Sequence, residues 1–353
     1  MDLTELKKDF YKRFNASDNF LYFTANGVLC TLLGCNETEY TPALSCTLSM
    51  GVKMFARRLD GGVINIQENT EDQSLSYIFS ANSEHFHGRN REFAKIIHQF
   101  EPYSLRGTQI LFEYSAPEFL PRREVCFTSL AQSFAKVSSL ELEPLKLASL
   151  ASCGENINTY LGIIYSKKGY CTLVSTGTPK RFPLPLTGYK ILSIHCAQKQ
   201  RDRAKQIRYA FEHIRRLFPH VATIADVTQE MLTMTAPHIR SRQAMKYMCH
   251  LVDENARIET AISALKRCDE RELFRQMQLS QASMERYWDL DKEHIFLANC
   301  CKPLNGIASV RSWNNGVTAI IEDNMIDQTV NIIRREFESN IGYQPAFCVS
   351  EPF

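Results

Sequence analysis

The apolar residues in the first half of the chain recur at spacings that predict a mixture of helices and strands. Asp2 is placed to cap a first helix. The helix is predicted from apolar residues that recur three or four positions apart: Leu3, Leu6, Phe10 and Phe14. Residues 44–66 alternate as two strands do on either side of Asp60-Gly61-Gly62, which predicts a β-hairpin. The pattern also predicts helices over 90–99, over 122–136 and from Pro144, and a strand over 108–114.

The second half of the chain begins with predicted strands and continues with predicted helices. Strands are expected over 169–175 and 189–196, separated by a proline-rich segment. A helix is expected over 204–217, and Asp226 with Gln229 is expected to form a capping box. The remaining elements are a helical block over 241–289, a strand over 316–322, a helix over 324–338 and a strand over 346–350. This mixture of elements predicts an α+β protein of two layers or two lobes.

The helix over 204–217 has basic residues on the face opposite its apolar stripe. They are Arg201, Arg203, Lys205, Arg208, Arg215 and Arg216. We interpret this face as solvated surface, because basic helical faces are more often solvated than bound to phosphate.

Composition and charge narrow the class of protein. The chain has 353 residues, a length typical of two domains, and its 41 Lys+Arg against 39 Asp+Glu give a net charge of +2. A charge this small disfavours a nucleic-acid partner. The N-terminal sequence offers no secretory signal and no segment is apolar enough to span a membrane, so we expect a cytoplasmic protein without a membrane partner. Its 12 cysteines are expected to be reduced thiols.

Few motifs that carry chemistry by themselves occur in the sequence. The sequence contains no GxxxxGK[ST] loop, GxGxxG turn, GxSxG elbow or HExxH helix. His85 and His87 would lie on one side of a strand, but the sequence places no further zinc ligand near them. We therefore expect no metal site.

Several local patterns, taken in order, resemble the galactokinase branch of the GHMP kinases. Ala25 and Gly27 match the start of the first signature of that family, APGRVNLIGEHTDYNGG, and Thr38-Glu39-Tyr40 matches its Thr-Asp-Tyr. The other matches are Leu217-Phe218-Pro219-His220-Val221, Glu254-Asn255-Ala256-Arg257 for Glu-Asn-x-Arg, Ser280-Gln281-Ala282-Ser283-Met284 for Ser-His-Ala-Ser-Leu, and Gly316-Val317-Thr318-Ala319-Ile320-Ile321. Each is short, but their order and spacing agree with the family over the whole chain.

The resemblance implies a two-lobed, α+β, GHMP-kinase-like fold. The N-terminal lobe, residues 1–178, is expected to be similar to domain 2 of ribosomal protein S5. The C-terminal lobe, residues 179–353, is expected to be a ferredoxin-like α/β lobe.

The positions that are catalytic in the family have other residues here. The transition-state arginine of APGRVN falls on Val28, and the catalytic aspartate falls on Thr159 or on Tyr165, depending on the alignment. The phosphate-binding loop GLSSSAS, which opens a helix, falls on 116–122, where two prolines remove amide donors and Glu118 adds negative charge. The glycine run of the third signature is replaced by Arg311-Ser312-Trp313-Asn314-Asn315. The resemblance therefore implies that no catalytic and no cofactor-binding residue is retained.

The sugar-contacting positions are altered less. The Glu-His-Thr-Asp set of the family aligns with Asn36, Glu37, Thr38 and Glu39, and a later sugar-contacting tyrosine aligns with Tyr209. These side chains can bond hydroxyl groups, so a galactose-like sugar is one expected ligand. The alternative is that Glu37 and Glu39 are solvated loop residues and that Tyr209 is packed on its helix.

Three functions follow from these observations. The first is a galactokinase-like protein that has lost ATP-dependent sugar phosphorylation, needs no cofactor, and binds a sugar or a protein partner. The second is an active sugar kinase that uses Mg-ATP and atypical residues, with Glu37, Glu39 or another acid as base. The third is a regulatory or scaffold protein that uses the former active-site cleft, which Phe119 and Trp313 either fill or line as anchors.

Overall fold

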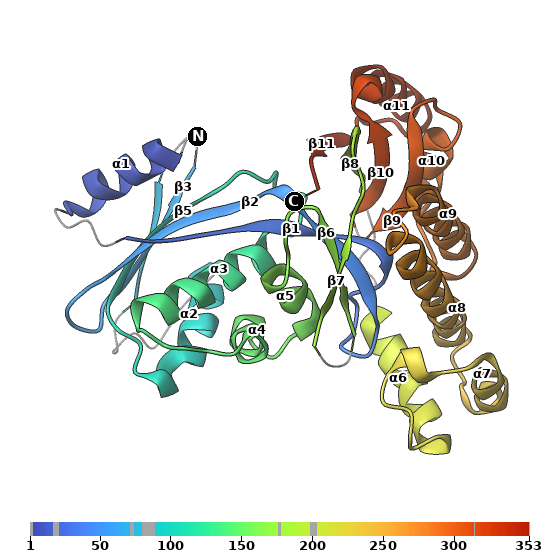
Figure 1. Ribbon diagram of the computed structural model, residues 1–353, viewed down its shortest axis with the longest axis horizontal. Coiled ribbons are helices and arrows are strands. Elements are labelled where there is room, and N and C mark those ends of the chain that lie inside the picture. Colours follow the sequence, from blue (N-terminus) through green and yellow to red (C-terminus); the bar gives the residue numbers. More distant parts are fainter. Residues whose placement is uncertain are drawn as a thin grey trace. The chain divides into compact units, whose positions relative to one another are not determined.

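A computed structural model describes residues 3–16, 21–70, 74–79, 89–175, 178–197, 203–313 and 315–352 (Figure 1). Internal contacts divide the chain into two units. Unit 1 contains Met1–Leu29 and Met50–Ile164, and unit 2 contains Cys30–Ser49 and Tyr165–Phe353. These bounds differ from the lobes expected from the sequence, whose division at residue 178 stays a prediction.

Unit 1 is built on a mixed sheet. Its strands are β1 (Tyr22–Gly34), β2 (Ala43–Arg58), β3 (Ile64–Asn69), β4 (Ser74–Phe79) and β5 (Thr108–Tyr114), of which β1 and β2 continue into unit 2. The order is β4-β3-β5-β2, with β1 paired to β2. Strand β3 runs parallel to β5 and antiparallel to β4, and β2 runs antiparallel to β5.

The predicted hairpin over 44–66 is therefore wrong, because β5 lies between β2 and β3. The chain does turn at Asp60-Gly61-Gly62, but β2 and β3 do not pair with each other on either side of the turn. Gly107, which lies just before β5, forms hydrogen bonds with Leu59 and Gly61 instead. Gly107 accepts a hydrogen bond from the Leu59 amide at 2.7 Å and donates one to Gly61 O at 2.8 Å. An added Cβ on Gly107 would lie 2.6 Å from Gly61 O, so this close approach requires a glycine.

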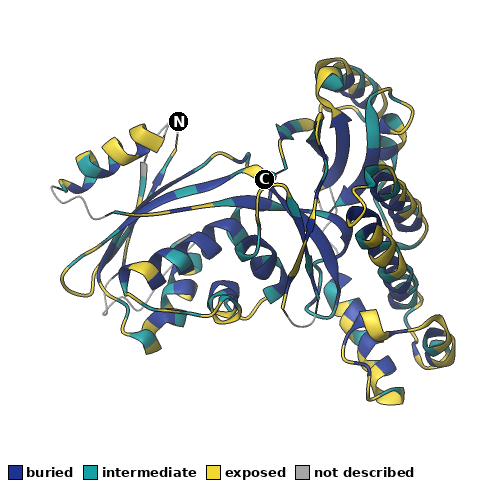
Figure 2. Ribbon diagram, in the orientation of Figure 1, coloured by how far each residue is buried: buried dark blue, intermediate teal, exposed yellow. Residues whose placement is uncertain are grey.

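Helices cover both faces of this sheet (Figure 1). They are α1 (Leu3–Phe14), α2 (Arg89–Phe100), α3 (Arg122–Val137), α4 (Pro144–Ser152) and α5 (Ile157–Ile164), with a 3-10 turn at Glu101–Tyr103. Successive residues of β2 point to opposite faces. Phe55 packs against α1, whereas Met54 receives a hydrogen bond from Ser133 of α3. Buried positions are concentrated on the strands and on α3 (Figure 2).

Unit 2 contains a four-stranded antiparallel sheet in the order β11-β8-β10-β9. Its strands are β8 (Tyr189–His195), β9 (Ile307–Trp313), β10 (Gly316–Glu322) and β11 (Ala346–Ser350). The first residues of β2 pair with β6 (Tyr170–Val174), which pairs with β7 (Lys180–Pro183). Strand β7 lies in the proline-rich segment, where the sequence predicted a connection, and β9 occupies the replaced glycine signature.

The helices of unit 2 include the long helical block that the sequence predicted. They are α6 (Arg203–Leu217), α7 (Gln229–Thr235), α8 (Arg242–Leu265), α9 (Glu270–Tyr287), α10 (Lys292–Cys301) and α11 (Ile326–Ile341), with 3-10 turns at Ile224–Asp226, Ala236–His238 and Asp323–Met325. The predicted capping box of Asp226 with Gln229 is wrong. Asp226 instead accepts from the amide of Thr223, and Thr228 caps α7 by accepting from Met231 N. None of the helices in the described part of the chain is long and apolar enough to cross a membrane.

Gly34 ends β1 with φ +79°, a left-handed conformation that favours glycine. A Cβ at this position would lie 2.2 Å from Pro42 O and 2.9 Å from Ala43 Cα. We predict that Gly34→Ala lowers the free energy of unfolding by more than about 2 kcal/mol, since steric overlap adds to the cost of the backbone conformation. Chemical denaturation measures this loss.

Gly169 provides the matched control, because its φ is +77° and nothing lies within 4 Å of an added Cβ. Gly169→Ala is expected to cost about 1 kcal/mol from backbone strain alone. Equal losses in the two variants would show that the contact with Pro42 does not constrain the turn.

Candidate functional site

A polar loop of residues 35–41 connects β1 to β2 and contains most of the candidate sugar-contacting residues. Its conformation is set by short-range hydrogen bonds. Asn36 Nδ2 donates to Thr31 Oγ1 at 2.9 Å, the Glu37 amide donates to Cys35 Sγ at 3.3 Å, and Thr41 Oγ1 donates to Thr38 O at 2.7 Å. We call this segment the polar loop.

Two carboxylates of the polar loop pair with two arginines of α6. Glu37 Oε1 lies 3.8 Å from Arg203 Nη1, and Glu39 Oε2 accepts a hydrogen bond from Arg208 Nη2 at 3.0 Å. Arg203 is only 4% exposed, and its guanidinium stacks over Trp288 at 5.8 Å. The interpretation of this helical face as solvated surface is therefore wrong for Arg203. Arg201, which belonged to the same predicted face, lies outside the described residues.

Tyr209 follows Arg208 on α6. Its ring lies 4.5 Å from the ring of His213, and it packs against a core cluster that includes Phe211. Tyr40 of the polar loop packs on Phe211 at 4.8 Å. The structure thus brings the polar loop and α6 together in unit 2 through charge pairs on one side and ring packing on the other.

The ion pair with Arg208 affects the protonation of Glu39. Partial burial alone would raise the pKa of this carboxyl, but a main-chain hydrogen bond and the Arg208 guanidinium outweigh burial and lower the pKa below its ordinary value. Glu39 is therefore an ionised acceptor at neutral pH.

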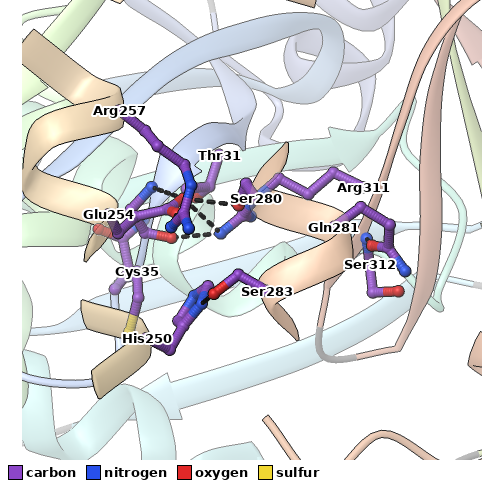
Figure 3. A network of polar contacts seen from close by, with 12 residues as sticks. Thr31, Cys35, His250, Glu254, Arg257, Ser280, Gln281, Ser283, Arg311 and Ser312 are labelled. Atoms are coloured by element: carbon purple, nitrogen blue, oxygen red, sulfur yellow. Dashed lines mark hydrogen bonds and ion pairs between the residues drawn. The ribbon is translucent and has the colours of Figure 1, made fainter. Parts of the chain in front are cut away.

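A buried network of charged and polar side chains lies at the start of the polar loop (Figure 3). Glu254 of α8 is 1% exposed. Its Oε1 accepts hydrogen bonds from the amide of Gly34 at 2.9 Å and from Ser280 Oγ at 2.6 Å, and its Oε2 accepts from Arg257 Nη1 at 2.8 Å. Burial raises the pKa of Glu254, but these hydrogen bonds and the neighbouring cations lower it by more.

Arg311 of β9 completes the network. It is 4% exposed; its Nε donates to Ser280 Oγ at 3.0 Å, and its Nη2 donates to Gly34 O and lies 3.6 Å from Glu254 Oε1. The sequence motif Glu-Asn-x-Arg pointed to Glu254 and Arg257, but the role of Arg311 was missed. Its segment was interpreted only as the loss of a glycine run.

His250 lies one helical turn before Glu254 on α8 and is fully buried. Its Nδ1 lies 2.9 Å from Ser283 Oγ, and its ring packs 4.9 Å from Trp288. Its Nε2 has no hydrogen-bond partner among the residues that the structure describes. Burial lowers the pKa of His250 to about 4, so the imidazole is neutral at physiological pH.

The positions aligned with the family's catalytic residues carry neither an arginine nor a carboxylate. Val28 is a buried residue of β1, and Thr159 is half-buried in α5, both in unit 1. Tyr165 follows α5 and belongs to unit 2, where its main-chain oxygen accepts from Arg181 Nε at 2.6 Å. The side chains at these three positions can serve neither as a carboxylate base nor as a guanidinium cation.

The segment aligned with the phosphate loop lies immediately before α3. Arg122, the first residue of α3, donates from Nε to Ala116 O at 2.7 Å, stacks over Tyr114 at 4.8 Å and lies 3.6 Å from Glu118. Pro121, the residue before α3, makes no side-chain cap among the described contacts. A cavity of about 480 Å³ beside this helix end is lined by Glu92, Phe93, Tyr114, Glu118, Leu120, Arg122, Arg123, Cys126 and Phe127.

No group of three or more His, Cys, Asp or Glu side chains that could hold a metal ion occurs in the ranges that the structure describes. His85 and His87 lie outside those ranges. Asn314, part of the replaced glycine signature, also lies outside them.

Sequence comparisons show which known proteins this chain is similar to. No protein-family model matches the sequence. A galactokinase of Halalkalibacterium halodurans is 23% identical over 245 residues, which are 63% of this chain and 62% of that protein. A galactokinase of Staphylococcus carnosus is 24% identical over 235 residues, 59% of each chain. The chain thus matches about three fifths of the length of these curated relatives.

Solved structures match over nearly the whole chain. Lactococcus lactis galactokinase complexed with galactose superposes with a TM-score of 0.86 at 14% identity, covering 99% of this chain and 98% of that one. Methanococcus jannaschii mevalonate kinase gives a TM-score of 0.63 at 11% identity, covering 96% and 99%. The fold is therefore that of the GHMP kinases, which confirms the predicted α+β class. Within that fold the chain is galactokinase-like, as its sequence motifs indicated.

We predict that Arg208→Ala raises the pKa of the Glu39 carboxyl, because the guanidinium that favours the ionised form is removed. A carboxylate with a lowered pKa stabilises the folded protein above its unfolded pKa, and this stabilisation disappears as the pH falls through the folded pKa. The variant should therefore lose stability at neutral pH and match the parent protein in acid. The loss should be below about 1 kcal/mol for a pair this exposed.

Carbon-detected NMR titration of Glu39 measures the shift in its pKa. Arg275→Ala is the control, and it should leave the Glu39 titration unchanged because Arg275 pairs with Glu272 on α9. An unchanged Glu39 titration in Arg208→Ala would contradict the ion pair.

We predict that His250 makes the protein sensitive to acid. The unfolded chain binds a proton at this imidazole below a pH of about 6.5, whereas in the folded protein the imidazole stays neutral until the pH falls to about 4. Stability is therefore lost as the pH falls between these values, by roughly 3 kcal/mol for this side chain. Chemical denaturation from pH 7 to 4 should show a shallower decline for His250→Gln than for the parent protein. Equal slopes in the variant and the parent protein would refute the assignment.

Proposed function

We propose that this protein is a galactokinase-like sugar-binding protein that does not transfer phosphate from ATP. The observation that carries this proposal is the contrast between two segments. The polar loop is held by an ion pair and by a buried hydrogen bond to Gly34, the residue directly before it. In the segment aligned with the phosphate loop, Arg122 instead donates a hydrogen bond to the carbonyl of Ala116.

The polar loop supports a neutral polyol as ligand. Asn36, Glu37 and Glu39 supply amide and carboxylate groups, which bond hydroxyls well. Because Arg203 and Arg208 balance the two negative charges, the loop favours an uncharged sugar over a cationic one. The Lactococcus lactis enzyme, whose structure contains galactose, makes galactose the first sugar to test.

The proposed loss of phosphoryl transfer rests on charge. Phosphoryl transfer depends on positioning and on cations that neutralise the transferred group, and a single arginine is typically worth ~10³–10⁵ in rate. Val28 is an apolar residue at the position aligned with that arginine, and the position aligned with the base carries Thr159 or Tyr165. At the start of α3, Pro117 and Pro121 provide no amide donors, and Glu118 would repel a phosphate.

The alternative of an active kinase would need another base. Glu37 and Glu39 are the acidic residues of the polar loop, and both pair with arginines. The lowered pKa of Glu39 makes it a weaker base than an ordinary glutamate. This alternative retains Mg-ATP as cofactor, and the same experiment tests it. A scaffold that binds a protein partner is the outcome left if neither sugar nor nucleotide binds.

Calorimetry with galactose, with and without Mg-ATP, tests the proposal together with an assay of ADP release. We predict measurable galactose binding, no stabilisation by Mg-ATP and no sugar-dependent ADP release. Glu39→Gln should weaken galactose binding roughly tenfold or more, because a charge-assisted hydrogen bond to a hydroxyl is lost.

Glu272→Gln provides the control, since it removes an ion pair of the same length, 3.0 Å, on α9. ADP release that depends on a hexose would establish the kinase alternative. The absence of binding by galactose and other common hexoses would refute the proposed function.

A further inference from the structure

Both main-chain polar groups of Gly34 are bound by buried charged side chains. The Gly34 amide donates to Glu254 at 2.9 Å, and the Gly34 carbonyl accepts from Arg311. Gly34 is the residue directly before the polar loop, and its left-handed conformation turns the chain toward Pro42, whose carbonyl accepts from the Cys35 amide at 3.2 Å. The network therefore holds Gly34, the residue at which the chain turns into the polar loop.

The network joins elements that are distant in the sequence but belong to unit 2. Glu254 comes from α8, Ser280 from α9 and Arg311 from β9 (Figure 3). Ser280 Oγ connects the other two side chains, since it donates to Glu254 and accepts from Arg311 Nε. Arg257 supplies a second cation to Glu254 through the other carboxylate oxygen. Each buried charge thus has an opposite charge and a directed hydrogen bond, as buried charges require.

We propose that Glu254, Ser280 and Arg311 are positioning residues of the sugar site, which hold the polar loop in its binding conformation before the ligand arrives. This inference rests on the proposed function for its ligand. Arg311 stands where the resemblance places the glycine run of the third signature, so a residue that replaces this run bonds the glycine directly before the polar loop. A loop that is already ordered loses less conformational entropy when it binds a ligand.

Two serines on α9 offer a matched pair of variants. Ser280 and Ser283 are both buried and lie within one turn of each other. Ser280 connects Glu254 to Arg311, whereas Ser283 contacts His250. Ser280→Ala removes the hydroxyl that connects Glu254 to Arg311, the two side chains that bond Gly34. Ser283→Ala removes a buried hydroxyl of the same size that takes no part in this connection. A merely structural effect should therefore appear in both variants.

Amide hydrogen exchange in the absence of sugar is the first measurement. We expect Ser280→Ala to accelerate exchange in the segment that spans Gly34 and the polar loop, and Ser283→Ala to leave that segment as in the parent protein. Equal exchange in the two variants would overturn the proposal. Arg311→Lys, which keeps the charge but cannot bond Ser280 and Gly34 with one planar group, replaces Ser280→Ala if that variant does not fold.

Calorimetry with galactose is the second measurement. We expect Ser280→Ala to weaken binding roughly tenfold and Ser283→Ala to leave the affinity unchanged. Equal affinities in the two variants would refute positioning even if exchange differs. If the parent protein binds no sugar, the proposed function fails. The exchange measurement then decides by itself whether the network orders the polar loop.

Discussion

The burial of two opposite charges, Glu254 and Arg311, is the constraint on which unit 2 depends most. Removing a charged group from water is costly, and an ion pair offsets that cost only when its remaining hydrogen-bonding capacity is also satisfied. Here the carboxylate has the Gly34 amide, the Ser280 hydroxyl and Arg257 as partners, and the Arg311 guanidinium has Ser280 and the Gly34 carbonyl. Because the hydrogen bonds of each buried charge come from residues on the other elements, α8, α9, β9 and the end of β1 must reach their positions together.

The parts of the fold that could be predicted from the sequence are those determined by local patterns. The helix that begins at Arg122, the helix that begins at Pro144 and the strand that ends at Tyr114 have a periodicity that needs no distant partner. The hairpin was wrong because the turn at Asp60-Gly61-Gly62 is a local signal, whereas the strand that separates β2 from β3 begins only at Thr108. Strand β7 was missed because its flanking prolines indicate a connection.

The candidate site shows the same division between local and distant information. The sequence could identify Asn36, Glu37 and Glu39 through a resemblance, since they are adjacent. It could not pair Glu39 with Arg208, 169 positions away, or Gly34 with Arg311, 277 positions away, because charge alone does not specify a partner. This explains why the basic face of α6 was interpreted as solvated. It also explains why Arg311 was regarded only as a lost glycine, although its guanidinium supports the polar loop.

Differences from the family pattern affect the two halves of the expected reaction unequally. A missing cation at residue 28, a missing carboxylate at residue 159 or 165, and a segment closed by Arg122 are three separate changes, and effects of residues that act as a unit are not additive. Restoring an arginine at residue 28 would leave two prolines and the negative charge of Glu118 in the segment before α3. The polar loop, by contrast, is supported by described contacts, since ion pairs hold Glu37 and Glu39 and the buried network holds Gly34. The contacts that hold the polar loop therefore lie within unit 2, whereas residue 28 and the start of α3 belong to unit 1.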